Sequence, residues 1–145
     1  MGKSQIAGQK FSEGYNCAQS VFYCFCEDLG FDKNVALKLA TGFGGGMGRK
    51  EEVCGAVAGG IIVLSAKHGR GEKDDRAATE LTYQKTRELM DRFAAKHGTF
   101  ICRQLLGGCE LTTEEGQKQY KENDLFNKVC KPCVQSAVET LEEII

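Results

Sequence analysis

The spacing of apolar residues constrains the fold of this chain more than any other feature. Apolar side chains recur at helical intervals along almost all of its 145 residues, and no segment alternates apolar and polar residues as a half-buried strand does. The sequence contains a single proline, so long segments run without a residue that would break a helix. We therefore predict an all-α fold, a single-domain helical bundle of about five to seven helices.

Glycines and capping residues divide this pattern into separate helices. The first helical segment spans residues 6–29, breaks near Gly14 and stops at Gly30, and Asp32 is expected to cap the second helix. The remaining helices are expected at 34–41, 51–68, 74–97, 100–106 and 128–145, with a short helical piece beginning at 112–116. The buried side of the helix at 74–97 is expected to carry Leu81, Leu89, Met90 and Phe93.

A glycine-rich loop, Gly42–Arg49, precedes the central helix. Its glycines do not match Gly-x-Gly-x-x-Gly, no Gly-Lys-Ser/Thr follows, and no strand precedes it, so a nucleotide-binding loop is disfavoured. We expect the glycines to provide left-handed backbone and close approach instead. Glu51 and Glu52 are predicted in the first turn of the central helix, where carboxylates interact favourably with the helix dipole.

Length, charge and hydropathy exclude several classes of protein. A chain of 145 residues is expected to form one domain, residues 1–145, and its net charge of −1 gives no electrostatic basis for binding nucleic acid or an anionic membrane. The longest apolar run, Val53–Ala66, is 14 residues long, and a membrane span needs about 20. The first residues lack the apolar stretch of a signal peptide. We predict a cytoplasmic protein with no nucleic-acid partner and no membrane insertion.

Eight cysteines in a reducing compartment are not expected to form a disulfide scaffold. Redox or metal-binding thiols are the better expectation, although some cysteines will pack as small apolar side chains. We assign Cys24 and Cys26 to the core, because their spacing sends the two thiols to different faces of a helix. Cys109 is left open.

Cys54 has the strongest functional position of the eight. It follows the glycine-rich loop and opens the segment Cys54-Gly-Ala-Val-Ala-Gly-Gly60. In the first turn of a helix, unpaired N–H groups and the dipole would lower the pKa of its thiol, which makes it a nucleophile and a metal ligand. The small residues after it would admit another backbone or a compact inorganic group, and close packing of two helices explains them equally well.

A second pattern is the Cys-x-x-Cys of Cys130 and Cys133. At this spacing on a helix the two sulfurs share a face, and a dithiol oxidoreductase is one interpretation. The thioredoxin type requires a preceding strand, and a structural zinc site usually takes two such pairs, so neither is supported. His68 and His97 each precede a helix-ending glycine and are interpreted as partners of the helix dipole.

Five segments taken together resemble the C_GCAxxG_C_C family of small redox-active proteins. They are, in order, Gly14-Tyr-Asn-Cys17-Ala-Gln-Ser, Gly42-Phe-Gly-Gly-Gly-Met-Gly48, Cys54-Gly-Ala-Val-Ala-Gly59, Cys102-Arg-Gln-Leu-Leu-Gly107, and Cys130 with the final helix. The resemblance implies four functional cysteines: Cys17, Cys54, Cys102 and Cys130. Cys133 lies where such proteins often have an aromatic residue. A similar module in split-Soret cytochromes accompanies haem with an iron–sulfur cluster, but this chain has no Cys-x-x-Cys-His for covalent haem.

The leading hypothesis is that these four cysteines converge on one redox-active site. Four thiolates suit an iron–sulfur cluster such as [2Fe–2S], or zinc, and the cluster would transfer electrons to a redox partner protein. Nearby cations, namely Arg49, Arg103 and Lys131, would offset thiolate charge.

Two other readings remain open. In a metal-free thiol oxidoreductase, Cys54 would act as the catalytic nucleophile on a disulfide or persulfide, and another cysteine would resolve the product. In a non-catalytic interaction module, all thiols would lie in the core. The sequence leaves open the electron donor and acceptor, the substrate, and whether the protein is a monomer or a homodimer.

Overall fold

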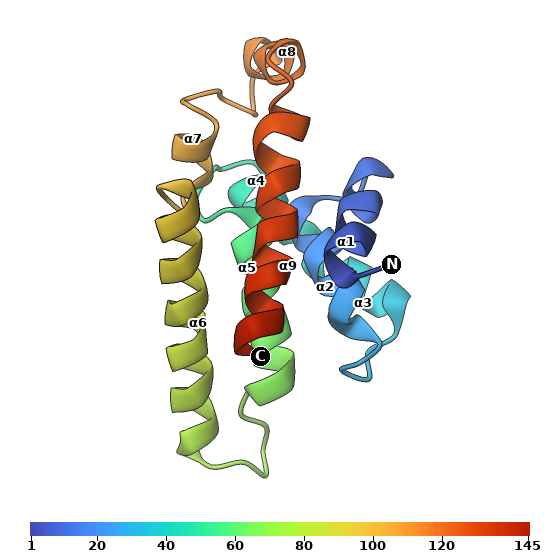
Figure 1. Ribbon diagram of the computed structural model, residues 1–145, viewed down its shortest axis with the longest axis vertical. Helices are drawn as coiled ribbons and strands as arrows, with labels where there is room; N and C mark the ends of the chain where they lie inside the picture. Colours follow the sequence, from blue (N-terminus) through green and yellow to red (C-terminus); the bar gives the residue numbers. More distant parts are fainter.

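Helices form most of the chain in the computed structural model, which describes residues 1–145 (Figure 1). The elements are α1 (Lys3–Ser12), α2 (Cys17–Cys26), α3 (Lys33–Ala40), a 3-10 turn (Thr41–Phe43), α4 (Gly44–Met47), α5 (Gly55–His68), α6 (Arg76–His97), α7 (Cys102–Leu105), α8 (Glu114–Glu122), a π-helical turn (Phe126–Cys130) and α9 (Lys131–Ile144). The predicted all-α fold is confirmed. The count is slightly above five to seven because α4 and α7 are single turns of four residues.

Side-chain caps set several helix starts where the sequence predicts them. The Asp32 carboxylate accepts a hydrogen bond from the Val35 N–H at 3.0 Å and begins α3, as expected. Thr113 caps α8 in the same way. Gly14 and Gly30, with φ of 105° and 80°, interrupt the first helical segment as expected.

The start of the central helix differs from the prediction. Glu51 and Glu52 precede α5, and Cys54 is its N-cap residue rather than part of its first turn. Glu51 has φ of 62°, outside the right-handed helical region. The Cys54 N–H donates to the Phe100 carbonyl at 2.8 Å, beside an isolated antiparallel bridge between Val53 and Ile101. Backbone groups of this stretch therefore pair with the segment before α7, and a helix that began earlier would need the same groups for its own hydrogen bonds.

The glycine-rich loop forms a left-handed turn. Five consecutive residues have positive φ: Gly45, Gly46, Met47, Gly48 and Arg49. A Cβ at Gly46 would lie 2.7 Å from the Glu51 Cα and 2.8 Å from the Cys102 Cβ. Glycine is therefore required at this position both for its conformation and for the approach of the Cys102 segment.

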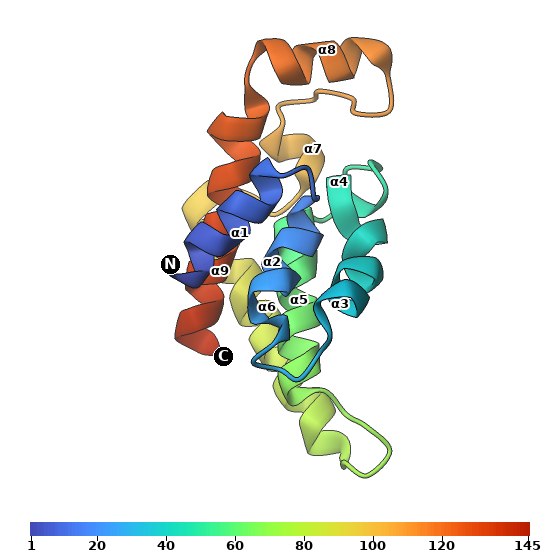
Figure 2. The same cartoon turned by 90° about the vertical axis from the view of Figure 1, so that its right-hand side faces the viewer.

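The central helix α5 lies between α2 on one side and α6 and α9 on the other (Figures 1 and 2). A Cβ at Gly59 would lie 2.7 Å from the Ala18 carbonyl oxygen, and one at Gly55 would lie 3.0 Å from the Cys17 Cβ. On another side of α5, a Cβ at Gly60 would lie 2.7 Å from the Leu89 Cδ2. The small residues after Cys54 thus allow α2 and α6 to pack closely on α5.

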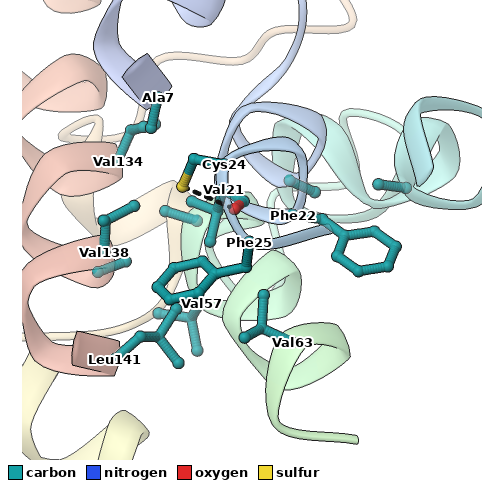
Figure 3. Close-up of a cluster of buried hydrophobic side chains, with 14 of the residues drawn as sticks. Ala7, Val21, Phe22, Cys24, Phe25, Val57, Val63, Val134, Val138 and Leu141 are labelled. Atoms are coloured by element: carbon teal, nitrogen blue, oxygen red, sulfur yellow. Dashed lines mark hydrogen bonds between the residues drawn. The ribbon is translucent and has the colours of Figure 1, made fainter. Parts of the chain in front are cut away.

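The main core lies where side chains of α1, α2, α5 and α9 meet (Figure 3). Phe25, Val57 and Val138 are buried there, and Cys24 lies among them with its thiol donating to the Val21 carbonyl at 3.2 Å. Cys26 is also fully buried. The assignment of these two thiols to the core is confirmed.

One predicted core residue is exposed. Leu89 and Phe93 are buried on α6, but Leu81 is 40% exposed. The helix has 22 residues, whereas α5 and α9 have 14, and its first turns extend past the end of α9 in Figure 1. Leu81 therefore lacks the neighbours that its spacing predicted. No helix combines the length and the apolar character that crossing a membrane requires.

Candidate functional site

The structure brings all four predicted cysteines to one cavity. Cys17, Cys54, Cys102 and Cys130 line a space of about 90 Å³, and Cys133 lines it as well. The beginnings of α2, α5 and α9 lie with the short α7 toward the same end of the molecule, below α8 (Figures 1 and 2). Chain segments more than 100 residues apart in sequence therefore present their thiols to one another.

The rest of the cavity wall is mostly apolar. Its other lining residues are Phe11, Asn16, Gly45, Gly46, Gly55, Leu105, Leu106, Leu111, Tyr120 and Val129. The glycines leave room next to the sulfurs, and the apolar side chains limit access of bulk water. As the side chains are placed, no three Cys, His, Asp or Glu groups are arranged to hold a metal ion.

Two of the thiols, Cys17 and Cys130, act most strongly on each other's pKa. The hydrogen bond from Cys17 lowers the pKa of Cys130, against the effect of burial, and the Tyr120 hydroxyl lowers it further. The same bond to Cys130 raises the pKa of Cys17 well above its ordinary value, and burial adds to this effect. Burial and the neighbouring Cys130 charge raise the pKa of Tyr120. Of these three groups, only Cys130 has its pKa lowered, whereas the pKa values of Cys17 and Tyr120 are raised.

Cys54 and Cys133 form a second pair, in which the pKa of one thiol is again lowered and that of the other is raised. The hydrogen bond from Cys133 lowers the pKa of Cys54, burial opposes it, and the backbone N–H groups of Ala56 and Val57 also lower it. The hydrogen bond to Cys54 raises the pKa of Cys133. A neighbouring thiol therefore lowers the pKa of Cys54 more than the helix N-terminus does, although the prediction rested on the helix alone.

Cys102 is the remaining member and differs from both pairs. Burial raises its pKa to about 12, the Cys54 and Cys130 thiols and Glu51 add to this, and Arg103 opposes it. The Arg103 guanidinium itself donates to the Lys50 carbonyl at 2.9 Å. Of the three cations expected near the thiols, Arg103 thus acts on a member of the site, whereas Arg49 lines a separate open groove beside α8.

Glu51 lies next to Cys102 and is the most unusual polar group nearby. Its side chain is only 4% exposed, and its Oε1 accepts a hydrogen bond from the Leu111 N–H at 2.7 Å. Its Oε2 is buried without a partner. Buried polar atoms without a partner are rare in proteins and often belong to functional regions.

Three of the eight cysteines lie outside the cavity. Cys24 and Cys26 are in the main core, and Cys109, which the sequence left open, donates from its thiol to the Gly116 carbonyl at 3.0 Å. A thiol that is bonded to a backbone carbonyl in an apolar setting is a structural side chain.

The sequence did not identify Cys133 and Tyr120 as site residues. The signal for Cys133 was present in the Cys-x-x-Cys spacing, which places it one turn beyond Cys130. No sequence signal marks Tyr120. His97, interpreted as a dipole partner, has its Nδ1 4.0 Å from the Cys133 Sγ, and burial lowers the pKa of its imidazole.

Comparison with known proteins gives a family but no individual relative. No curated protein and no solved structure matches the chain. One family model, described as "Putative redox-active protein (C_GCAxxG_C_C)", matches residues 15–144. That range includes all five thiols of the cavity. With nearly the whole chain matched and its family cysteines gathered at one cavity, the chain belongs to the C_GCAxxG_C_C family of redox-active proteins.

Proposed function

We propose that this protein is an electron-transfer protein whose cavity thiols hold an iron–sulfur cluster, such as [2Fe–2S]. Zinc, which is redox-inactive, could occupy the same thiols only as a structural metal without electron transfer. One observation carries the proposal: cysteines from four separate segments line a single cavity, and most of the remaining wall is apolar. A buried dithiol needs two cysteines, so five thiols at one cavity favour an occupant with several soft ligands.

The residues fit such a group in their chemistry. Cys17, Cys54, Cys102 and Cys130 would supply four thiolates, the ligand set of a [2Fe–2S] cluster. The cluster would supply one-electron chemistry, and a partner protein would receive the electron. The pKa values of Cys54 and Cys130 are lowered, whereas those of Cys17 and Cys102 are raised. Binding would therefore release protons from these two thiols and turn their side chains toward the occupant.

A metal-free thiol oxidoreductase is the second candidate. It is favoured by two pairs of thiols, Cys17 with Cys130 and Cys54 with Cys133, in each of which the pKa of one thiol is lowered and that of the other is raised. This difference in pKa suits thiol–disulfide exchange, in which a thiolate attacks and a second thiol resolves the mixed disulfide.

Anaerobic purification followed by iron and acid-labile sulfide analysis tests the first candidate. We expect visible absorption and stoichiometric iron and sulfide, both lost when Cys17, Cys54, Cys102 or Cys130 is replaced by serine. Cys24→Ser is the matched control and should keep both, since Cys24 bonds a backbone carbonyl in the core. Colourless metal-free protein whose thiols titrate reversibly to a disulfide would replace this proposal with the second.

A further inference from the structure

Cys133 is a fifth thiol in a site whose family pattern has four cysteines. It is the third residue of α9, and only 2% of its surface is exposed. It lines the cavity, and Cys54 is the strongest influence on its pKa. Neither the family pattern nor a four-ligand cluster gives this residue a role.

We propose that Cys54 and Cys133 close to a reversible disulfide that joins the start of α5 to the first turn of α9. The two thiols come from different helices, are both almost fully buried and line the same cavity of about 90 Å³. Each is the strongest single influence on the other's pKa, which places them close together in that space and favours their bonding. If the proposed metal function holds, this disulfide removes Cys54 from the ligand set, and oxidation and metal loading exclude each other.

Other pairings of Cys54 are less favourable. Cys17 and Cys130 act most strongly on each other's pKa, so each would have to turn away from its partner to reach Cys54. Cys102 is affected by Cys54 through charge alone, and it is not among the groups that shift the pKa of Cys54. Cys133 is therefore the thiol that is placed to resolve an oxidised Cys54.

The cavity selects a small oxidant. Cys54 is only 5% exposed, and the space beside it is about 90 Å³ with a mostly apolar wall. Hydrogen peroxide is small and uncharged and can enter this cavity, whereas glutathione disulfide, a large and charged peptide disulfide, cannot. The Cys54 thiolate would attack peroxide to give a sulfenic acid and hydroxide. The Cys133 thiol would then attack the sulfenic sulfur, forming the disulfide and one water.

The test is disulfide mapping of metal-free protein after treatment with hydrogen peroxide and alkylation of the remaining thiols. Cys130 and Cys133 fall in one tryptic peptide, since Lys131 precedes Pro132. The variants Cys130→Ser and Cys133→Ser each leave one cysteine in that peptide and form a matched pair. We expect the peptide that contains Cys54 to crosslink to it in Cys130→Ser and not in Cys133→Ser.

Fragmentation of the wild-type crosslinked peptide should locate the bond at Cys133, independently of any variant's folding. In Cys133→Ser, Cys54 should accumulate as a sulfenic acid that dimedone traps. Dithiothreitol should restore both thiols in the wild type, and glutathione disulfide at equal concentration should leave them reduced.

A dominant bond from Cys54 to Cys17, Cys102 or Cys130 would overturn the pairing, and so would a free Cys133 beside oxidised Cys54. Closure by glutathione disulfide as readily as by peroxide would overturn the choice of oxidant. Iron and sulfide content is measured separately, so absence of the disulfide and absence of a cluster are distinguishable results.

Discussion

Helix α2 carries two kinds of cysteine, and they differ in what their sulfur touches. Cys17 is its first residue, lines the cavity and hydrogen-bonds to the Cys130 thiol. Cys24 and Cys26 lie two to three turns further along, where their thiols donate to the carbonyls of Val21 and Tyr23 at 3.2 and 3.1 Å. A single helix thus contributes one thiol to a reactive group and two to the hydrophobic core.

Burial alone does not separate the two kinds. Cys54 in the cavity is 5% exposed and Cys24 in the core is 9% exposed. Yet the hydrogen bond from Cys133 lowers the pKa of Cys54, whereas burial raises the pKa of Cys24 to about 12. A thiol with a thiol donor and backbone N–H donors is activated, and an equally buried thiol that bonds a carbonyl is not.

The largest expected effect comes from filling the space that brings Cys102 into the cavity. Gly46→Ala introduces a Cβ within 2.8 Å of the Glu51 Cα and Cys102 Cβ at a residue with φ of 66°. Alanine is strained at this left-handed backbone conformation, and its Cβ overpacks the contact. Together these effects should lower the free energy of unfolding by about 2–5 kcal/mol. Urea unfolding measures this loss.

Gly48→Ala is the matched control for Gly46→Ala. Gly48 has a similar φ of 59°, but a Cβ there would meet no atom within 4 Å. It should cost about 1–2 kcal/mol from backbone strain alone. Equal losses in the two variants would show that close approach to Cys102 does not explain the glycine.

The next largest expected effect is a difference in labelling rate between a cavity thiol, Cys130, and a core thiol, Cys24. At pH 7 in metal-free protein, a pKa below 9.0 for Cys130 and about 12 for Cys24 give at least roughly a thousandfold difference in thiolate fraction. Since more basic thiolates are stronger nucleophiles, the difference in rate falls to roughly thirtyfold. Time-resolved labelling with methyl methanethiosulfonate and peptide fragmentation measures it. Similar rates would abolish the distinction between the two kinds of thiol.

Sequence reasoning located the family cysteines but not how they pair. The order of the motifs was enough to group Cys17, Cys54, Cys102 and Cys130, because the family pattern contains four cysteines at these motifs. The contact between Cys54 and Cys133 depends on how α5 and α9 pack. That packing is set by side chains distributed over both helices, and no local spacing reports it.

The start of α5 shows a second limit of the sequence. Glu51 and Glu52 have the composition of a first helical turn, and local preference therefore favours a helix there. The structure instead gives Glu51 a left-handed φ and pairs its carbonyl with the Arg103 N–H at 3.1 Å. This tertiary pairing overrides the local preference for a helix at Glu51 and Glu52. As a result, α5 begins only after Cys54, which is its N-cap residue.

The pH dependence of stability should identify Cys24 as a core thiol. Because burial raises its pKa from 9.0 to about 12, its stabilising contribution is complete below pH 9 and is lost as the pH rises toward 12. At pH 10 the wild type should have lost between about 1 and 2 kcal/mol through this residue. Cys24→Ala should show a correspondingly shallower decline in unfolding free energy between pH 8 and 10. Parallel curves for the two proteins would contradict the assignment.

The smallest effect compares two helix caps of similar strength at opposite ends of the molecule. Asn16 accepts from the Gln19 N–H at 2.9 Å at the start of α2, and Asp75 accepts from the Ala77 N–H at 2.9 Å at the start of α6. Replacing either by alanine should lower the unfolding free energy by about 1 kcal/mol.

Only Asn16→Ala should also change the alkylation rate of Cys17, because that thiol occupies the next residue and the same cavity wall. Asn16→Ser keeps a capping oxygen and should restore both stability and rate. An equal change in Cys17 labelling for Asp75→Ala would mean that global loosening, not the local helix start, positions the thiol.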